Sequence, residues 1–189
     1  MKHPFEPFIL KDSKNLIIGT LPPENISYYY SNSSNTRMWD ILKSILDNTE
    51  EIPKNSYKEL SVEEKKDILK KLNLSMCDII YEYDRKKEST KDNDIIPIKY
   101  LDINSLIEDT SIENLLFVYK SAAKWFLHSL ENKKPIKSPK PKINIHGEFY
   151  NYKLHNKIIK CILLPNPLNR GKKGETLPIK RDIYKKWIL

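Results

Sequence analysis

Aromatic and amide side chains are concentrated in one stretch of the chain, between residues 19 and 39. A glycine followed by paired prolines opens the stretch at Gly19–Pro23, three tyrosines occupy residues 28–30, and Asn35 and Trp39 come near its end. Glycine lets the backbone approach a ligand, and prolines stiffen a loop. Tyrosines followed by amides can line a flat slot in which an aromatic base stacks and is hydrogen-bonded. The same tyrosines could instead simply pack on a sheet.

A second loop of unusual composition follows the last apolar run before the C-terminal helical pattern. Pro165 and Pro167 precede the apolar residue Leu168, and Arg170 and Lys172 follow it. An apolar tip held by prolines among amides and cations suits a wedge that enters a DNA duplex while its neighbours bind phosphates. Taken alone, the pattern is also typical of an ordinary turn. The two loops together indicate a site for a nucleic-acid base.

The charge of the chain agrees with a polyanionic partner. The sequence has 33 Lys and Arg against 25 Asp and Glu, a formal net charge of +8. Such a surface attracts nucleic acid. A composition rich in lysine, asparagine and isoleucine also arises in AT-rich genomes without any function, so charge alone does not establish DNA binding.

Cysteine usage and hydropathy exclude several classes of protein. The two cysteines, Cys77 and Cys161, lie inside apolar runs, where a buried free thiol is expected and no four-cysteine zinc or iron–sulfur site can form. Met1–Pro4 lacks the core of a signal peptide, and no apolar run approaches the roughly 18 residues of a membrane span. We therefore expect a cytoplasmic protein with no metal, no cofactor and no membrane partner.

Short apolar runs alternate with helical patterns along the chain. The expected strands are Leu16–Gly19, Met76–Tyr81, Leu115–Tyr119 and Ile158–Leu164. The expected helices are Trp39–Leu46, a helix begun by a capping box at Ser61–Glu64, Ala122–Leu130 and Arg181–Ile188. This alternation predicts an α/β fold, a three-layer α/β/α sandwich around a central, mainly parallel four-stranded sheet. Ligands of such sheets bind beyond the carboxyl ends of the strands.

The chain is expected to form one domain, residues 1–189, because a chain of this length can bury a single sizeable core. The helix at residues 61–72 could be an insertion in the basic fold, and so could a hairpin at residues 143–154, where apolar and polar residues alternate. The segment Lys133–Lys142, rich in proline and lysine, is expected to be a stiff connector and not a domain boundary. We expect a monomer.

The two loops resemble the motifs of a known enzyme family. Gly19–Pro23 resembles the first motif of the uracil-DNA glycosylase superfamily, a glycine-x-x-proline loop. Leu164–Asn169 resembles its second motif, a histidine-proline-serine-proline-leucine-serine loop. The tyrosines and the asparagine before Trp39 are similar to the hypoxanthine-DNA glycosylase branch. The second strand and the loop after it resemble the same branch through Cys77–Ile80, Arg85, Ser89 and Asp92.

Two departures from the family pattern concern the residue that holds the attacking water. In mismatch-specific relatives the third position of the first motif is an asparagine, whereas this chain has Leu21. The hypoxanthine branch carries its asparagine three residues before the tryptophan, where this chain has Thr36, with Asn35 one place earlier. A one-residue shift would restore Asn35 to that role. Otherwise the protein binds DNA without cutting it, or it uses another residue.

The resemblance implies that a base is flipped out of DNA and its N-glycosidic bond hydrolysed. Leu168 would fill the gap left by the flipped nucleotide. Tyr29 or Tyr30 would stack on the base, backbone amides near Thr20 would hydrogen-bond to it, and Asn35 would hold the water.

Asp78 is the main alternative to Asn35 as the catalytic group. A carboxylate at a strand end could orient the water, or it could form a purely structural pair with Arg85. The four histidines show no partner pattern in the sequence and are expected to be structural or surface groups.

Three functions remain open from the sequence. The first is removal of a deaminated base, uracil or hypoxanthine, from double- or single-stranded DNA; the second is removal of a bulky modified phage base, such as glucosylated hydroxymethylcytosine, in antiviral defence. The third is a catalytically inactive DNA-binding or interaction module. The candidate residues are Asn35 and Asp78 for catalysis, Gly19, Thr20, Leu21, Tyr29, Tyr30, Trp39 and Arg85 for the substrate, and Pro165, Asn166, Pro167, Leu168, Asn169, Arg170 and Lys172 for DNA.

Overall fold

Five strands form a mixed central sheet in the order β2-β1-β5-β7-β6. The structure, a computed structural model, describes residues 1–22, 26, 28–30, 35–52, 59–86, 94–131, 143, 146–169 and 176–189. The strands are β1 (Asn15–Gly19), β2 (Leu74–Asp78), β5 (Asn114–Phe117), β6 (Gly147–Leu154) and β7 (Lys157–Leu163). β1 pairs in parallel with β2 and β5, β5 pairs in parallel with β7, and β6 pairs antiparallel to β7.

The sheet has one strand more than the sequence predicts. The alternating segment expected to be a separate hairpin at residues 143–154 contributes β6, which extends the central sheet at its edge. Along β6, partly buried and exposed residues mostly alternate, as in an edge strand that packs on one face only. The alternation in the sequence therefore identified a strand, but it did not show which sheet the strand joins.

The predicted strand Met76–Tyr81 is two strands in the structure. β2 ends at Asp78, and β3 (Ile80–Arg85) pairs antiparallel with β4 (Ile95–Tyr100) in a separate two-stranded sheet. Because residues 74–80 are all buried, the apolar run continues through the break and conceals it. β4, which contains a proline and is largely exposed, gave no strand pattern in the sequence.

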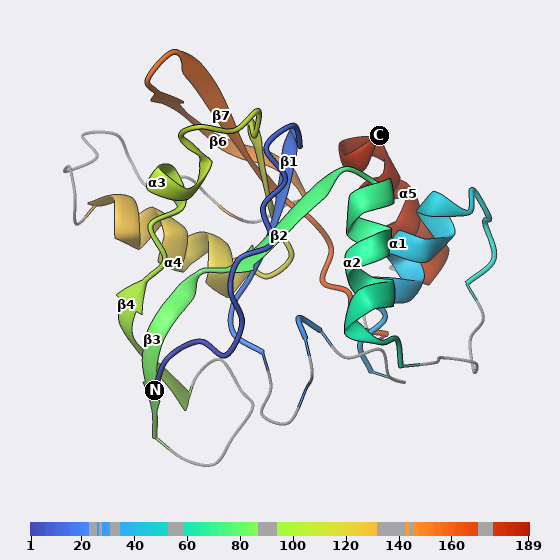
Figure 1. The fold of residues 1–189 in the computed structure, drawn as a ribbon, viewed down its shortest axis with the longest axis horizontal. Coiled ribbons are helices and arrows are strands. Elements are labelled where there is room, and N and C mark those ends of the chain that lie inside the picture. Colours follow the sequence, from blue (N-terminus) through green and yellow to red (C-terminus); the bar gives the residue numbers. More distant parts are fainter. Residues whose placement is uncertain are drawn as a thin grey trace.

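Helices cover both faces of the central sheet (Figure 1). α1 (Met38–Leu46), α2 (Val62–Lys71) and α5 (Leu177–Ile188) lie on one side, while α3 (Ile103–Ile107) and α4 (Lys120–Glu131) lie on the other. Successive side chains of β1 point to opposite faces of the sheet. Ile17 packs in the core on the side of α1, α2 and α5, whereas Leu16 and Ile18 pack in the core on the side of α3 and α4. This arrangement confirms the predicted three-layer α/β/α architecture.

The capping box predicted at the start of α2 is present. The Ser61 side chain accepts a hydrogen bond from the Glu64 amide at 3.2 Å, and the Glu64 carboxylate accepts one from the Ser61 amide at 2.7 Å. α2 then contributes Ile68 and Leu69 to the core that it shares with α1 and α5.

The helices that follow the neighbouring strands β1 and β5 lie on opposite faces of the sheet. β1 leads to α1 on one face, whereas β5 leads to α4 on the other. The carboxyl ends of β1 and β5 therefore form a topological switch point, which is the usual position of ligands in open α/β sheets. Both sequence motifs start at this edge, because one follows β1 and the other follows β7.

Candidate functional site

The two motif loops are joined by backbone hydrogen bonds, although about 130 residues separate them in the sequence. The Arg37 amide donates to the Pro167 carbonyl at 2.8 Å, and the Asn169 amide donates to the Asn35 carbonyl at 2.7 Å. Between these bonds Thr36 and Leu168 form an antiparallel bridge. The segments 35–37 and 167–169, called the paired loops below, therefore behave as one structural unit.

The side chains of the paired loops differ in exposure. Asn35 and Asn169 are exposed, whereas Pro165 and Pro167 are buried. Leu168, expected from the sequence to be an exposed tip, is only partly exposed, and its backbone is bridged to Thr36. The predicted phosphate-binding residues Arg170 and Lys172 lie outside the described residues.

Helix α5 supports the second loop from beneath with two buried polar side chains. The Lys180 ammonium donates to the Leu168 carbonyl at 2.7 Å and to the Asn166 side-chain oxygen at 3.4 Å. The Tyr184 hydroxyl donates to the Pro165 carbonyl at 2.8 Å. Both side chains are fully buried, and burial raises the pKa of Tyr184 well above its usual value. A buried cation is stable only when acceptors surround it, so Lys180 ties the loop to the helix.

Lys180 and Tyr184 are not among the residues that the sequence predicts for the site. A signal exists in their spacing: they are four residues apart on the helix face that also carries the buried residues Leu177 and Ile188. A lysine on an apolar helix face is a candidate for a buried, hydrogen-bonded cation, yet its partners could not be identified without the fold.

The tyrosines of the first loop pack in the core, which is the second of the two arrangements that the sequence allows. Tyr28, Tyr29 and Tyr30 are all buried, and burial raises the pKa of Tyr28 to about 12. Trp39 is also fully buried, and its indole N–H donates to the carbonyls of Tyr29 and Tyr30 at 3.1 and 2.8 Å. In this structure Trp39 holds the tyrosine backbone, and none of these three tyrosine rings is open for stacking on a base.

Tyr30 has an unusual backbone conformation. Its φ of 50° lies in the left-handed region, which is uncommon for a residue with a bulky side chain. Its carbonyl accepts hydrogen bonds from the Trp39 indole and from the fully buried Lys65 ammonium at 3.2 Å. Strained residues persist where the surroundings fix them, and they are frequent at functional sites.

Gly19, Tyr30 and Asp78 converge at the carboxyl ends of β1 and β2. Gly19 is opposite Asp78 in the parallel pairing of these strands. A β-carbon on Gly19 would lie 2.1 Å from Asp78 Oδ1 and 2.2 Å from the Tyr30 hydroxyl oxygen, so any other residue there would have to displace both side chains. Burial, and then the charge of Asp78, raise the pKa of Tyr30 well above its usual value. Within the described part of the chain this hydroxyl has no hydrogen-bond partner.

Asp78 is paired with a histidine. His3 Nε2 lies 3.0 Å from Asp78 Oδ2, and the two side chains are only 6% and 4% exposed. The sequence allows a structural pair of Asp78 with Arg85, but the Arg85 guanidinium lies over the Tyr83 ring, 5.4 Å from the centroid. No sequence pattern predicts the contact, because 75 residues separate His3 from Asp78.

The remaining candidates of the first motif lie beside this cluster. Thr20 is buried, and its carbonyl accepts a hydrogen bond from the Ile80 amide at 3.4 Å. Leu21 is partly exposed and packs against the core on the α4 side of the sheet. Neither residue offers an amide or carboxylate side chain for positioning water, which leaves Asn35 and Asp78 as the candidates for that role.

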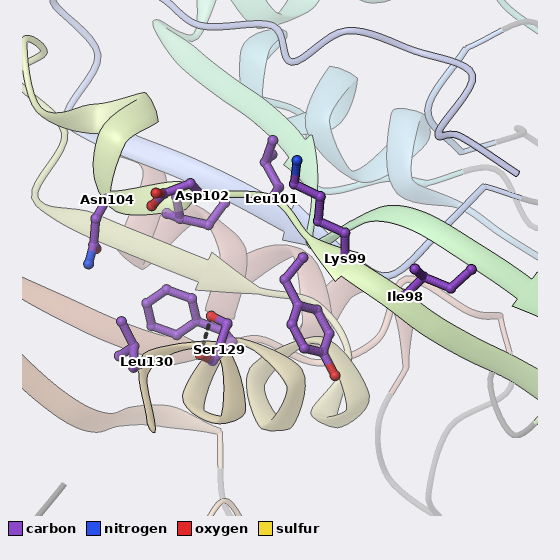
Figure 2. A pocket seen from close by; sticks show the side chains of 10 residues that line it. Ile98, Lys99, Leu101, Asp102, Asn104, Ser129 and Leu130 are labelled. Atoms are coloured by element: carbon purple, nitrogen blue, oxygen red, sulfur yellow. Dashed lines mark hydrogen bonds between the residues drawn. The ribbon is translucent and has the colours of Figure 1, made fainter. Parts of the chain in front are cut away.

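A cavity of about 340 Å³ lies away from the motif loops, between the segment from β4 to α3 and the second half of α4 (Figure 2). Lys99, Asp102, Asn104, Ser129 and Leu130 are among the residues that line it. None of the residues predicted for the site contributes to this cavity.

Two other features bear on the chemistry of the chain. Within the described residues no group of three or more His, Cys, Asp and Glu side chains could hold a metal ion. Both cysteines are buried, and burial raises the pKa of each thiol above its usual value, which disfavours the nucleophilic thiolate.

Among the residues that the structure describes, no helix has the length and apolarity needed to span a bilayer.

Comparisons with known proteins show a likeness of fold. No protein-family model and no curated protein matches the sequence. The structure is similar to the solution NMR structure of a candidate uracil DNA glycosylase from Methanosarcina acetivorans, with a TM-score of 0.61 and 16% sequence identity. The similarity covers 99% of this chain and 96% of that one. The chain therefore has the same overall fold as that protein, as its motifs implied.

Proposed function

We propose that the protein is a DNA glycosylase, which turns a base out of DNA and hydrolyses its N-glycosidic bond to leave an abasic site. The observation that carries the proposal is the backbone pairing of segment 35–37 with segment 167–169. It places the two loops that resemble glycosylase motifs side by side. The candidate uracil DNA glycosylase with a similar fold supports the same function.

The paired loops have the properties of a DNA wedge. Unstacking and flipping a nucleotide costs a few kcal/mol, so the side chain that fills the gap must be held firmly. Leu168 is held through its bridge to Thr36 and through the bond from Lys180 to its carbonyl. Its side chain is partly exposed, and the neighbouring Asn169 is exposed and available for the DNA backbone.

Asp78 and Asn35 are the proposed catalytic residues. Cleavage of an N-glycosidic bond develops positive charge on the sugar and negative charge on the departing base, while water adds to the sugar carbon. The Asp78 carboxylate, at the carboxyl end of β2, would stabilise the positive charge or orient the water. Asn35, exposed beside Leu168, would hold the water by its amide.

The proposed partner is DNA, because the net charge of +8 favours binding to phosphates. The proposed substrate base is uracil or hypoxanthine. A purified sample should be incubated in excess over oligonucleotides that each contain one altered base: uracil, hypoxanthine or glucosylated hydroxymethylcytosine. Abasic sites are then revealed by alkaline cleavage, and an unmodified oligonucleotide serves as control.

We expect release of a deaminated base, with the strand intact until alkali is added. Release of only the glucosylated base would assign the protein to the removal of bulky phage bases. Binding to DNA without release of any base would contradict the proposal and indicate a non-catalytic module.

A further inference from the structure

We propose that His3 is a positioning residue that holds Asp78 for base release, so that the N-terminal segment forms part of the reaction site. This inference rests on the proposed function. It concerns a residue that neither motif contains, and it follows from how the first residues of the chain pack against β2 and β3.

The His3 ring is fixed by several independent contacts. Its backbone amide donates to the Tyr81 carbonyl at 2.8 Å. The Phe5 amide donates to its Nδ1 at 3.1 Å, so a neutral ring carries its proton on Nε2, the atom that faces Asp78. The Phe5 carbonyl oxygen lies 2.7 Å from the same Nδ1, and the ring stacks on Tyr29 at 5.7 Å between centroids. The ring therefore presents Nε2 to Asp78 in one orientation. Second partners that fix an imidazole in this way are typical of functional histidines.

The pairing determines where the two carboxylate oxygens of Asp78 point. Oδ2 faces His3 Nε2 at 3.0 Å, and Oδ1 points toward Gly19, 2.1 Å from where a β-carbon on that residue would be. The Tyr30 hydroxyl oxygen lies 2.2 Å from the same point. A hydrogen bond from the imidazole offsets the cost of burying the carboxylate, and it keeps Oδ1 directed at the carboxyl end of β1.

The Tyr30 hydroxyl beside Asp78 distinguishes the group formed by His3, Asp78 and Tyr30 from a purely structural ion pair. Most buried polar side chains have hydrogen-bond partners, because leaving one unsatisfied costs about 1–3 kcal/mol. The Tyr30 hydroxyl is buried, with only 9% of the residue exposed, and has no such partner within the described residues. A water molecule or a substrate atom between this hydroxyl and Asp78 would complete the cluster, which places the reacting group next to the carboxylate that His3 holds.

The test compares His3→Ala and His3→Gln with Phe5→Leu as the matched control. Phe5 belongs to the same segment and its ring contacts His3, but its side chain does not hold Asp78. The single-turnover rate of base release and the Kd are measured on the same oligonucleotide. For His3→Ala we expect a rate loss on the order of 100-fold with little change in Kd, because small displacements of a catalytic group are costly. His3→Gln should recover part of the rate, since an amide N–H can still donate to the carboxylate.

A full rate for His3→Ala, in a wild-type protein that releases a base, would overturn this inference and leave the proposed function intact. Equal losses of rate, DNA affinity and thermal stability in both His3 variants would overturn it as well, because they indicate a structural role. If the wild-type protein releases no base, the proposed function itself has failed. The pairing is also measured without activity, by ¹⁵N NMR of the histidine rings; Asp78→Asn should shift the His3 signals, and unchanged signals would contradict the pairing.

Discussion

The buried ammonium group of Lys180 donates a hydrogen bond to the carbonyl of Leu168 at 2.7 Å. Through this bond, helix α5 supports the residue proposed to enter DNA. Because Leu168 is also bridged to Thr36, hydrogen bonds connect helix α5 to both motif loops. Substitutions in the helix and in each loop test this arrangement.

Lys180→Met should loosen the second loop while preserving most of the side-chain volume. The Leu168 carbonyl would lose its donor, and an unsatisfied buried acceptor costs about 1–3 kcal/mol. We expect lower stability in urea unfolding and slower base release from duplex DNA. Lys186→Met is the control, because Lys186 is an exposed residue of the same helix and the change in net charge is identical. Equal effects of the two variants would show that charge, and not loop support, is responsible.

Leu168→Ala should slow base release from duplex DNA more than from single strands. The wedge is needed only where a neighbouring stack must be opened, at a cost of a few kcal/mol. The ratio of the single-turnover rates on the two substrates is the measurement. Ile179→Ala, which shortens an exposed apolar residue of α5, should leave the ratio unchanged. A proportional loss on both substrates for Leu168→Ala would mean that Leu168 is not a wedge.

Asp78→Asn and Asn35→Ala should each reduce the rate of base release by roughly 100- to 1000-fold while changing the Kd for DNA by little, as expected of groups that act in the transition state. Asp78→Asn keeps the shape of the side chain, so its effect reports the charge. If Asn35→Ala retains the wild-type rate, Asn35 does not hold the water and Asp78 alone is the catalytic candidate. A loss of affinity equal to the loss of rate would make either residue a substrate contact.

Stability should decrease in alkaline solution. Burial raises the pKa of Cys77 well above its usual value of 9.0 and the pKa of Tyr184 well above 10.0. Between the unfolded and folded pKa values only the unfolded chain loses these protons, so the free energy of unfolding falls as pH rises above about 9. Urea unfolding on both sides of this pH measures the change, and Cys77→Ala should reduce the slope. A free energy that stays constant or increases above this pH would contradict the burial of these groups.

The sequence predicts those parts of the fold that depend on local patterns. The buried run of β1 and the capping box at Ser61–Glu64 are confirmed, because the residues that determine them are neighbours in the chain. The sequence does not predict the break after Asp78, because the residues on both sides of it are buried. The spacing of apolar residues indicates which positions are buried, but it does not indicate where the chain leaves one sheet and joins another.

The site is harder to predict because its contacts are long-range. The motif residues identify the two loops, yet the bond between Arg37 and Pro167 exists only once the sheet has brought the ends of β1 and β7 together. His3 and Lys180 gave no recognisable pattern, since each acts on a partner in a different element. Their roles follow from the fold and not from composition or spacing.

Mass spectrometry of the reaction products tests the central claim most directly. Duplex oligonucleotides that carry uracil or hypoxanthine are incubated with the wild-type protein and with Asp78→Asn, both in excess chelator. We predict that the wild-type protein yields the free base and an intact strand with one abasic site, and that Asp78→Asn yields far less of both. Cleaved phosphodiester bonds, a requirement for a divalent ion, or no free base from any duplex that the protein binds would contradict the assignment as a glycosylase.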